Sequence, residues 1–282
     1  MSRALVALAA LTLVAGVARA DDWTRNYPVH GRPTVSIRTN DGHIHVTEGD
    51  VKTVQVRVHT NGWHIGGQVF VEGRQTGDRI EVEARAPRWN MGITFSFHET
   101  RRLEIEVLTP RQSDLVIRTG DGGVEIERIA GRVEVETGDG HIRAEDLKGD
   151  VRVHTGDGGL ELHALDGTLV ASSGDGSVRV SGRFDGLELE TGDGRVVAEA
   201  LQGSKVGDGW SISTGDGPVT LRLAAPIAAD LDARTNDGSI TTDFPIAVSG
   251  SWGRRSLHGA LNGGGSPIRL RTGDGSIRLE KI

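Results

Sequence analysis

Residues 119–122 read Thr-Gly-Asp-Gly, and the same tetrapeptide returns at residues 137–140, 155–158 and 191–194, with Ser-Gly-Asp-Gly at residues 173–176. The aspartates of these five copies recur at every eighteenth position of the chain. Four further copies, two of them with asparagine in the second place, have their aspartates at Asp41, Asp216, Asp237 and Asp274. A period of about 20 residues indicates a solenoid or a similar array.

Apolar residues flank each tetrapeptide at fixed offsets. The positions six and four residues before the aspartate are apolar in all nine copies, as in Val133 and Val135, and so is the position three residues after it, as in Ile142. This alternation predicts a strand before the turn and another after it, each with one buried face. Glycine or asparagine before the aspartate and glycine after it predict a tight turn with a left-handed corner, closed as an Asx turn by the aspartate and also by the Thr or Ser hydroxyl.

Outward charges favour stacked coils over an antiparallel meander. Four residues after the aspartate, successive copies carry Glu125, Arg143, Glu161 and Arg179. Opposite charges in this row stabilise each other only if equivalent residues of successive copies are neighbours, as they are in a parallel stack with a strand spacing of about 4.8 Å. We therefore predict an all-β fold, a parallel β-solenoid or right-handed β-helix with coils of roughly 18 residues.

The first twenty residues have the pattern of a secretory signal peptide. Arg3 precedes an apolar run from Ala4 to Ala15, and Ala18-Arg19-Ala20 is typical of a cleavage site. The run is too short for a membrane-spanning helix, which needs about 20 apolar residues. Losing Arg3 and Arg19 changes the net charge from −7 to −9, which gives no basic surface for nucleic acid. We expect an exported protein that is periplasmic, on the cell surface or secreted, with no transmembrane anchor and, because cysteine is absent, no acylation or disulfide.

We expect three segments. Residues 1–20 form the signal peptide, residues 21–114 an N-terminal β region and cap with the first repeat, and residues 115–282 the solenoid repeats with a C-terminal insertion at 244–267. Atypical caps are expected because the ends of a solenoid expose unpaired strand edges. Aromatic residues gather in the irregular regions, either as plugs of the rod ends or as binding loops. The candidate partner-binding residues are Trp89, Phe95, Phe97 and Trp252.

The repeats carry a family resemblance, together with the segments Leu261–Gly265 (LNGGG) and Arg271–Leu279 (RTGDGSIRL). They resemble the bacterial putative-adhesin domain family with TGDG β-strand repeats, a domain of unknown function of type 4097, over most of the mature chain. The resemblance implies an exported β-solenoid. Because the repeated core comes without a recognisable catalytic grouping, the leading hypothesis is a non-enzymatic adhesin or interaction scaffold whose partner is a protein or glycan of the cell envelope or surface.

Calcium binding is one alternative. Stacking would place Asp121, Asp139, Asp157, Asp175 and Asp193 about 5 Å apart along one edge. Calcium takes six to eight oxygen ligands, and a β-roll calcium repeat supplies them from both corners of each coil, whereas the opposite corners here show no matching acidic pattern. Structural turns are the favoured interpretation of these aspartates, and a calcium-binding β-roll-like adhesin remains the alternative.

A carbohydrate-active β-helix enzyme is a second alternative. Acid pairs such as Glu134 with Glu136, or Glu188 with Glu190, have the residue type that glycoside hydrolysis uses. A spacing of two also follows from strand pleating alone, which favours solvated faces. The histidines His43, His45, His154 and His163 have no carboxylate partner that the sequence can place, so we predict no catalytic residues and no cofactor.

Overall fold

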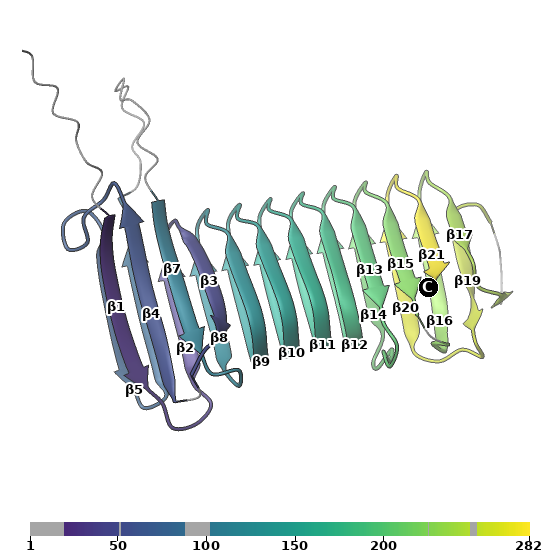
Figure 1. Ribbon diagram of the computed structural model, residues 1–282. Coiled ribbons are helices and arrows are strands. Elements are labelled where there is room, and N and C mark those ends of the chain that lie inside the picture. The colour runs from purple at the N-terminus through teal and green to yellow at the C-terminus, as the bar shows by residue number, and fades with distance from the viewer. Residues whose placement is uncertain (1–19, 51, 88–101, 225, 249–252) are drawn as a thin grey trace, which may run out of the picture.

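The computed structural model describes residues 20–50, 52–87, 102–224, 226–248 and 253–282 (Figure 1). All regular secondary structure in these ranges is β-strand. The 21 strands form one hydrogen-bonded system that is wound into a rod. The predicted all-β parallel solenoid is confirmed. The predicted signal peptide lies almost wholly outside the described residues, and within them no helix is long and apolar enough to cross a membrane.

Four long strands show the coil most directly: β9 (Val124–Thr137), β10 (Ile142–Thr155), β11 (Leu160–Ser173) and β12 (Val178–Thr191). Each begins just after one tetrapeptide and ends on the first residue of the next. Adjacent strands pair in parallel, with Val124 beside Ile142 and Ile142 beside Leu160. Equivalent residues of successive repeats are therefore neighbours, as the sequence predicts.

Each long strand bends half-way and contributes to two sheets. In β10 the bend is marked by left-handed φ angles, 52° at Asp146 and 120° at Gly149, whereas β12 contains no residue with a left-handed φ. We call the strands that lead into a tetrapeptide the inbound sheet and those that leave it the outbound sheet. The tetrapeptides form one edge of the rod, the TGDG edge, and the bends form the opposite edge.

The core is a set of apolar columns between the two sheets. All eighteen predicted positions on the inbound sheet are buried, from Val35 to Leu270. The predicted outbound positions are buried as well, apart from Ile240 and Thr242 in the short outermost strand β17 (Ile240–Thr242), which are half-buried. Each buried Val, Leu or Ile side chain contributes about 1.5–3 kcal/mol, so the stacked columns supply the main stabilising term.

The N-terminal cap is an insertion folded onto the outer side of the first coil. Strands β2 and β3 stack on β8 and β9, so the coils of Asp41 and Asp121 are neighbours although the whole cap separates them in sequence. The intervening strands β6 and β7 continue the two sheets in parallel, and β5, β4 and β1 then close them with antiparallel pairs. The bounds are β1 (Ala20–Pro28), β2 (Thr34–Thr39), β3 (His43–Glu48), β4 (Thr53–Asn61), β5 (Phe70–Thr76), β6 (Arg79–Arg85), β7 (Arg102–Thr109) and β8 (Asp114–Thr119).

Coil order at the C-terminal end departs from chain order. Strands β13 (Val196–Ala200) and β14 (Trp210–Thr214) stack on the two halves of β12, and β15 (Val219–Leu223) follows β13. The next coil along the rod is the last one in sequence, because β20 (Pro267–Thr272) pairs with β14 and β21 (Ile277–Lys281) pairs with β15. Figure 1 shows these two yellow strands between green neighbours.

The coil of Asp237 therefore lies outside the coil of Asp274. Strand β16 (Ala229–Thr235) pairs with β20, and β17 pairs with β21. Strand β19 (Ser256–Leu261) then covers β16 in antiparallel orientation, and β18 (Ile246–Val248) covers β19. This end of the inbound sheet is thus closed by antiparallel strands, as is the N-terminal end.

Candidate functional site

The TGDG edge is held by a ladder of side-chain hydroxyls. Thr155 Oγ1 lies 2.9 Å from the carbonyl oxygen of Gly140 in the preceding coil and accepts a hydrogen bond from the Gly158 N–H at 3.2 Å. The hydroxyls of Ser173, Thr191, Thr214, Thr235 and Thr272 lie 2.8–2.9 Å from the equivalent carbonyl oxygens. Each hydroxyl thus links its own turn to the turn beside it.

The glycine after the aspartate is required by close approach. A Cβ atom on Gly140 would lie 2.0 Å from the carbonyl oxygen of Gly122, and the same distance recurs at the equivalent glycines of the later coils. Among the tetrapeptide glycines, Gly42 alone has a left-handed φ, at 115°. The predicted left-handed corner is therefore wrong for the other copies, in which the stacking distance selects glycine.

The aspartates of the TGDG edge point to solvent. The five metal candidates Asp121, Asp139, Asp157, Asp175 and Asp193 lie exposed along one edge, and the described residues give their carboxylates no hydrogen-bond donor. An Asx-type contact occurs at Asp41, whose Oδ1 accepts the Gly42 N–H at 2.6 Å. The Asx turn predicted for the five aspartates is thus wrong, and in two of these turns the Thr155 or Ser173 hydroxyl accepts the hydrogen bond from the following glycine N–H instead. In the described ranges no three acidic or histidine side chains converge closely enough to hold a metal ion.

A charge ladder crosses the outbound sheet as predicted. Arg143 lies between two acids, 3.5 Å from Glu125 and 3.2 Å from Glu161, and Arg179 binds the other carboxylate oxygen of Glu161 at 2.9 Å. His45 extends the row, with its Nδ1 3.5 Å from Glu125. The hydrogen bond from Arg143 holds the pKa of the Glu161 carboxyl below its ordinary value. These contacts confirm that equivalent residues of successive repeats are neighbours.

Of the two acid pairs considered for hydrolysis, one binds an arginine and the other lies elsewhere on the rod. Glu134 and Glu136 both bind the Arg118 guanidinium, at 3.0 and 3.2 Å. Glu188 and Glu190 lie exposed on β12, more than two coils further along the rod.

Two histidines bond to serines in the next coil. His154 Nδ1 is 2.8 Å from Ser172 Oγ, and His163 Nδ1 is 3.1 Å from Ser181 Oγ. The register places a carboxylate-bearing residue on the other side of each, Glu136 beside His154 and Glu145 beside His163. The sequence alone did not identify these rows, although the constant repeat spacing was the signal that could have found them. His43, in contrast, lies near an acid, with its Nε2 3.7 Å from a carboxylate oxygen of Glu125.

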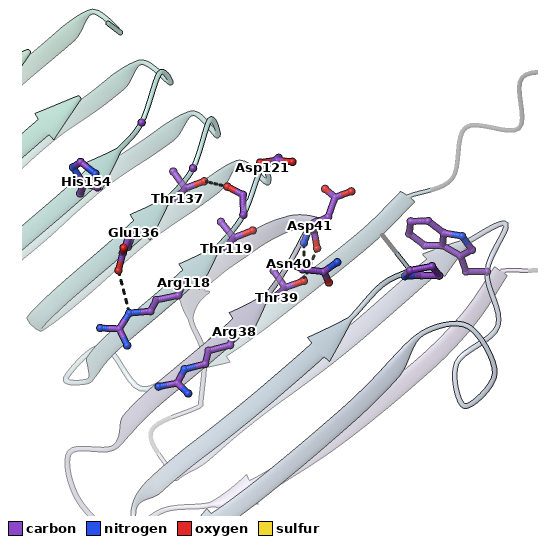
Figure 2. Close-up of a pocket in the computed structure, with 15 residues that line it drawn as sticks. Arg38, Thr39, Asn40, Asp41, Arg118, Thr119, Asp121, Glu136, Thr137 and His154 are labelled. Carbon is purple, nitrogen blue, oxygen red and sulfur yellow. Dashed lines mark hydrogen bonds and ion pairs between the residues drawn. The ribbon is translucent and has the colours of Figure 1, made fainter. Parts of the chain in front are cut away.

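A groove of about 980 Å³ lies where the cap meets the TGDG edge (Figure 2). Arg38, Arg118 and His154 line it from the inbound sheet, and Asp41 and Asp121 line it from the turns. Trp63 and Pro87 line it from the cap. The groove therefore combines cations, carboxylates and apolar rings in one open surface feature.

The rim of the groove is fixed by a departure from the repeat. Asn40 replaces the usual glycine, and its side chain makes two hydrogen bonds with the backbone of Ala86, from Nδ2 to the carbonyl oxygen at 2.9 Å and from the Ala86 N–H to Oδ1 at 2.8 Å. Trp63 is 9% exposed, and its carbonyl oxygen accepts a hydrogen bond from Thr60 Oγ1 at 2.9 Å. Trp63 is thus hydrogen-bonded to a strand of the cap. Pro87 directly follows Ala86, which is hydrogen-bonded to Asn40.

Two side chains in the groove have no partner among the described residues. Thr119 Oγ1 is buried without a hydrogen-bond partner, whereas the equivalent hydroxyls of the following coils all have one. Arg38 lies in register beside Arg118, and no carboxylate oxygen of the described residues lies within 4 Å of it. The sequence analysis missed this place, although Asn40 in place of glycine and the arginines at equivalent positions of the first two repeats, Arg38 and Arg118, are signals that could have found it. The residues predicted to bind a partner, Trp89, Phe95, Phe97 and Trp252, lie outside the described residues.

The coil architecture agrees with a known family. The model of the family described as Toastrack DUF4097 matches residues 33–280. The chain belongs to this family. The Toastrack DUF4097 match includes every strand from β2 to β20 and most of β21, and so the whole TGDG edge and the groove-lining turns. No curated protein matches the chain.

Solved structures with similar folds come from bacteria. A "putative lipid binding protein" from Parabacteroides distasonis is 13% identical with a TM-score of 0.50, over 93% of this chain and 98% of that chain. A "putative adhesin" from Bacteroides fragilis is 10% identical with a TM-score of 0.41, over 93% and 97%. A "putative cell adhesion protein" from Clostridium sporogenes is 13% identical with a TM-score of 0.34, over 94% and 100%. At these identities the likeness concerns the fold alone.

Proposed function

We propose that the protein is an exported, non-enzymatic binding scaffold that acts in the periplasm or at the cell surface, in the manner of an adhesin. The groove at the start of the TGDG edge carries this proposal. Charged side chains of the Arg143 row pair with each other, whereas Arg38 and Asp121 face solvent in the groove without an ion partner among the described residues. Exposed charges without a partner also occur elsewhere on the rod, as at Arg195, but in the groove they lie beside the cap residues Trp63 and Pro87. Polar groups held open on a fixed surface are suited to binding a partner.

The stacked coils support recognition because they keep the geometry of the groove fixed. Its walls come from adjacent coils whose glycines approach to backbone contact and whose hydroxyls bridge one turn to the next. A site carried by strands keeps its geometry better than one carried by free loops. The polar face of the groove therefore needs little reordering when a partner binds.

Location and partner can be tested together. The tagged chain is expressed in its producing bacterium, the cells are fractionated, and the exported fraction is cross-linked and captured. We expect the chain in the envelope or medium without residues 1–20, cross-linked to an envelope or surface component that a tagged, unrelated exported β protein does not capture. Recovery of the uncleaved chain from the cytoplasm, or an identical capture profile for the two proteins, contradicts the proposal.

A further inference from the structure

The groove runs along the rod rather than across it. The second residue of four successive turns lines it, namely Asn40, Gly120, Gly138 and Gly156. Four adjacent coils span three strand spacings, about 14 Å in all. A ligand that fills the groove must therefore be elongated and must pass one coil after another.

Hydrogen-bond donors line one side of the groove. Arg38 and Arg118 stack in register, and like charges in that position destabilise a sheet unless they are neutralised. Arg118 is neutralised by two acids of the next coil, whereas Glu83, which lies in register on the other side of Arg38, binds Arg85 at 2.7 Å. In the described part of the chain Arg38 thus has no acidic partner within 4 Å. A guanidinium fork binds a carboxylate through two parallel hydrogen bonds, so Arg38 is suited to an acidic group.

Acceptors line the other side of the groove. Asp41 and Asp121 are exposed at successive turns, and a carboxylate accepts hydrogen bonds from hydroxyl groups. Thr119, the first residue of the turn that carries Asp121, is only 9% exposed, and its hydroxyl has no partner, whereas the equivalent hydroxyls of the later coils form hydrogen bonds. A buried polar atom without a partner is rare in proteins, and Thr119 Oγ1 shares this state with Tyr27 Oη and Trp210 Nε1 among the described residues.

The spacing of the coils separates two kinds of elongated ligand. An extended peptide advances by about 3.4 Å per residue, which does not match a strand spacing of about 4.8 Å. A pyranose chain linked through opposite ring positions advances by close to one strand spacing per sugar. A polysaccharide can therefore present the same groups to each coil in turn.

We propose that the groove binds an acidic glycan, a strand of carboxylated pyranose units lying along the rod with about one unit per coil. This inference rests on the proposed function as a binding scaffold and names its ligand class. The glycan carboxylate bonds to Arg38, ring hydroxyls donate to Asp41 and Asp121, and the terminal ring packs against the Trp63 and Pro87 wall. Because Asp41, Asp121 and Glu136 also line the groove, the attraction for an acidic group is local to Arg38 and does not extend over the whole groove.

The test uses purified mature chain and two acidic probes, oligogalacturonate and oligomannuronate, with their carboxyl-reduced forms as neutral counterparts. Calorimetry is expected to show binding of at least one acidic probe and about tenfold weaker binding of its reduced form, the loss of one charge-assisted contact. Arg38→Ala should weaken binding of the acidic probe by about the same factor. Arg195→Ala is the matched control, because Arg195 is an exposed arginine beside a TGDG turn distant from the groove, and it should bind like the wild type.

Several outcomes would overturn the glycan assignment. They are no binding of either acidic probe, equal binding of a probe and its reduced form, equal effects of the two arginine variants, or tighter binding of a hexaglutamate peptide. Neither arginine contributes to the core, so we expect both variants to fold. Thermal melts check this. If the envelope capture succeeds and the acidic probes do not bind, the scaffold proposal stands and the glycan assignment falls.

Discussion

Glycine follows every aspartate of the TGDG edge because adjacent turns touch through their backbones. The carbonyl oxygen of one turn occupies the place where a Cβ atom of the next would lie, as at Gly140 and Gly122. In later coils such as that of Thr155 the buried hydroxyl then satisfies backbone groups on both turns, which a buried edge requires. At the residue scale the turn is thus defined by its neighbour in the stack as much as by its own conformation.

Replacing Gly140 tests this contact. Gly140→Ala should lower the free energy of unfolding by about 3 kcal/mol, because the added methyl forces two backbones apart. Gly67→Ala is the control, since a Cβ atom there meets its nearest neighbour at 3.6 Å and φ lies outside the left-handed region. Urea unfolding measures both variants, and equal stabilities would contradict the close-approach account.

Replacing the hydroxyl tests the ladder. Thr155→Val should cost about 1–3 kcal/mol, because Gly140 loses a donor to its carbonyl and the buried Gly158 N–H loses its acceptor. Thr119→Val has the same shape change at the same repeat position, but its hydroxyl has no partner to lose. We expect the latter variant to be as stable as the wild type or more so. Equal losses in chemical denaturation would show that the bridge contributes nothing.

At the element scale, strands pair through rows of side chains that take one member from each coil. The row through Glu125, Arg143 and Glu161 illustrates this, since each side chain meets its partners on the strands to either side. Alternating sign along the row favours the parallel register, because a slip by one residue would break each pair and expose the apolar columns.

The Arg143 row predicts a specific pH dependence. The pKa of Glu161 is lowered by the Arg143 hydrogen bond, so its contribution to stability is present above 4.5 and is lost as pH falls through the lowered value. Arg143→Ala should cost about 0.5 kcal/mol at pH 7, as expected of surface pairs, and the difference should shrink in acid and in high salt. Denaturant titrations across pH measure it. Arg195→Ala, which lacks an ion partner in the described ranges, should show no such trend.

Strand positions and register were predictable from the sequence because they repeat. Val133, Val135 and Ile142 mark the buried face of one coil, and equivalent residues mark all the others. The turn geometry was not predictable, because glycine is selected equally by a left-handed φ and by close approach. Only the position of Gly122, in the neighbouring coil, distinguishes the two causes at Gly140.

At the scale of the whole molecule, similar coils do not determine their own order. The tetrapeptides at Asp216, Asp237 and Asp274 carry the same signal, so nothing in them says which two are neighbours. The segment between the last two aspartates is long enough to carry the chain outward through β18 and β19 and back into the stack. Long-range pairing of this kind is a property of the closed rod and is invisible in any single repeat.

The candidate site was only partly predictable for the same reason. The sequence drew attention to aromatic residues in irregular regions, whereas the groove depends on Arg38 and Arg118 becoming neighbours across the whole cap insertion. The insertion that separates them in sequence also supplies Trp63 and Pro87 to the groove wall. A cap that closes the rod thus builds the surface on which the proposed function rests.

The stacking order can be tested directly with paired cysteines, because the chain has none of its own. Ser211 and Arg269 are register partners, and Asp232 lies in register on the far side of Arg269. A disulfide needs Cα atoms about 4.4–6.8 Å apart, which adjacent strands provide and strands two places apart do not. We predict that Ser211→Cys with Arg269→Cys oxidises readily to an intramolecular disulfide. Disulfide formation by Ser211→Cys with Asp232→Cys in place of that pair would contradict the stacked order.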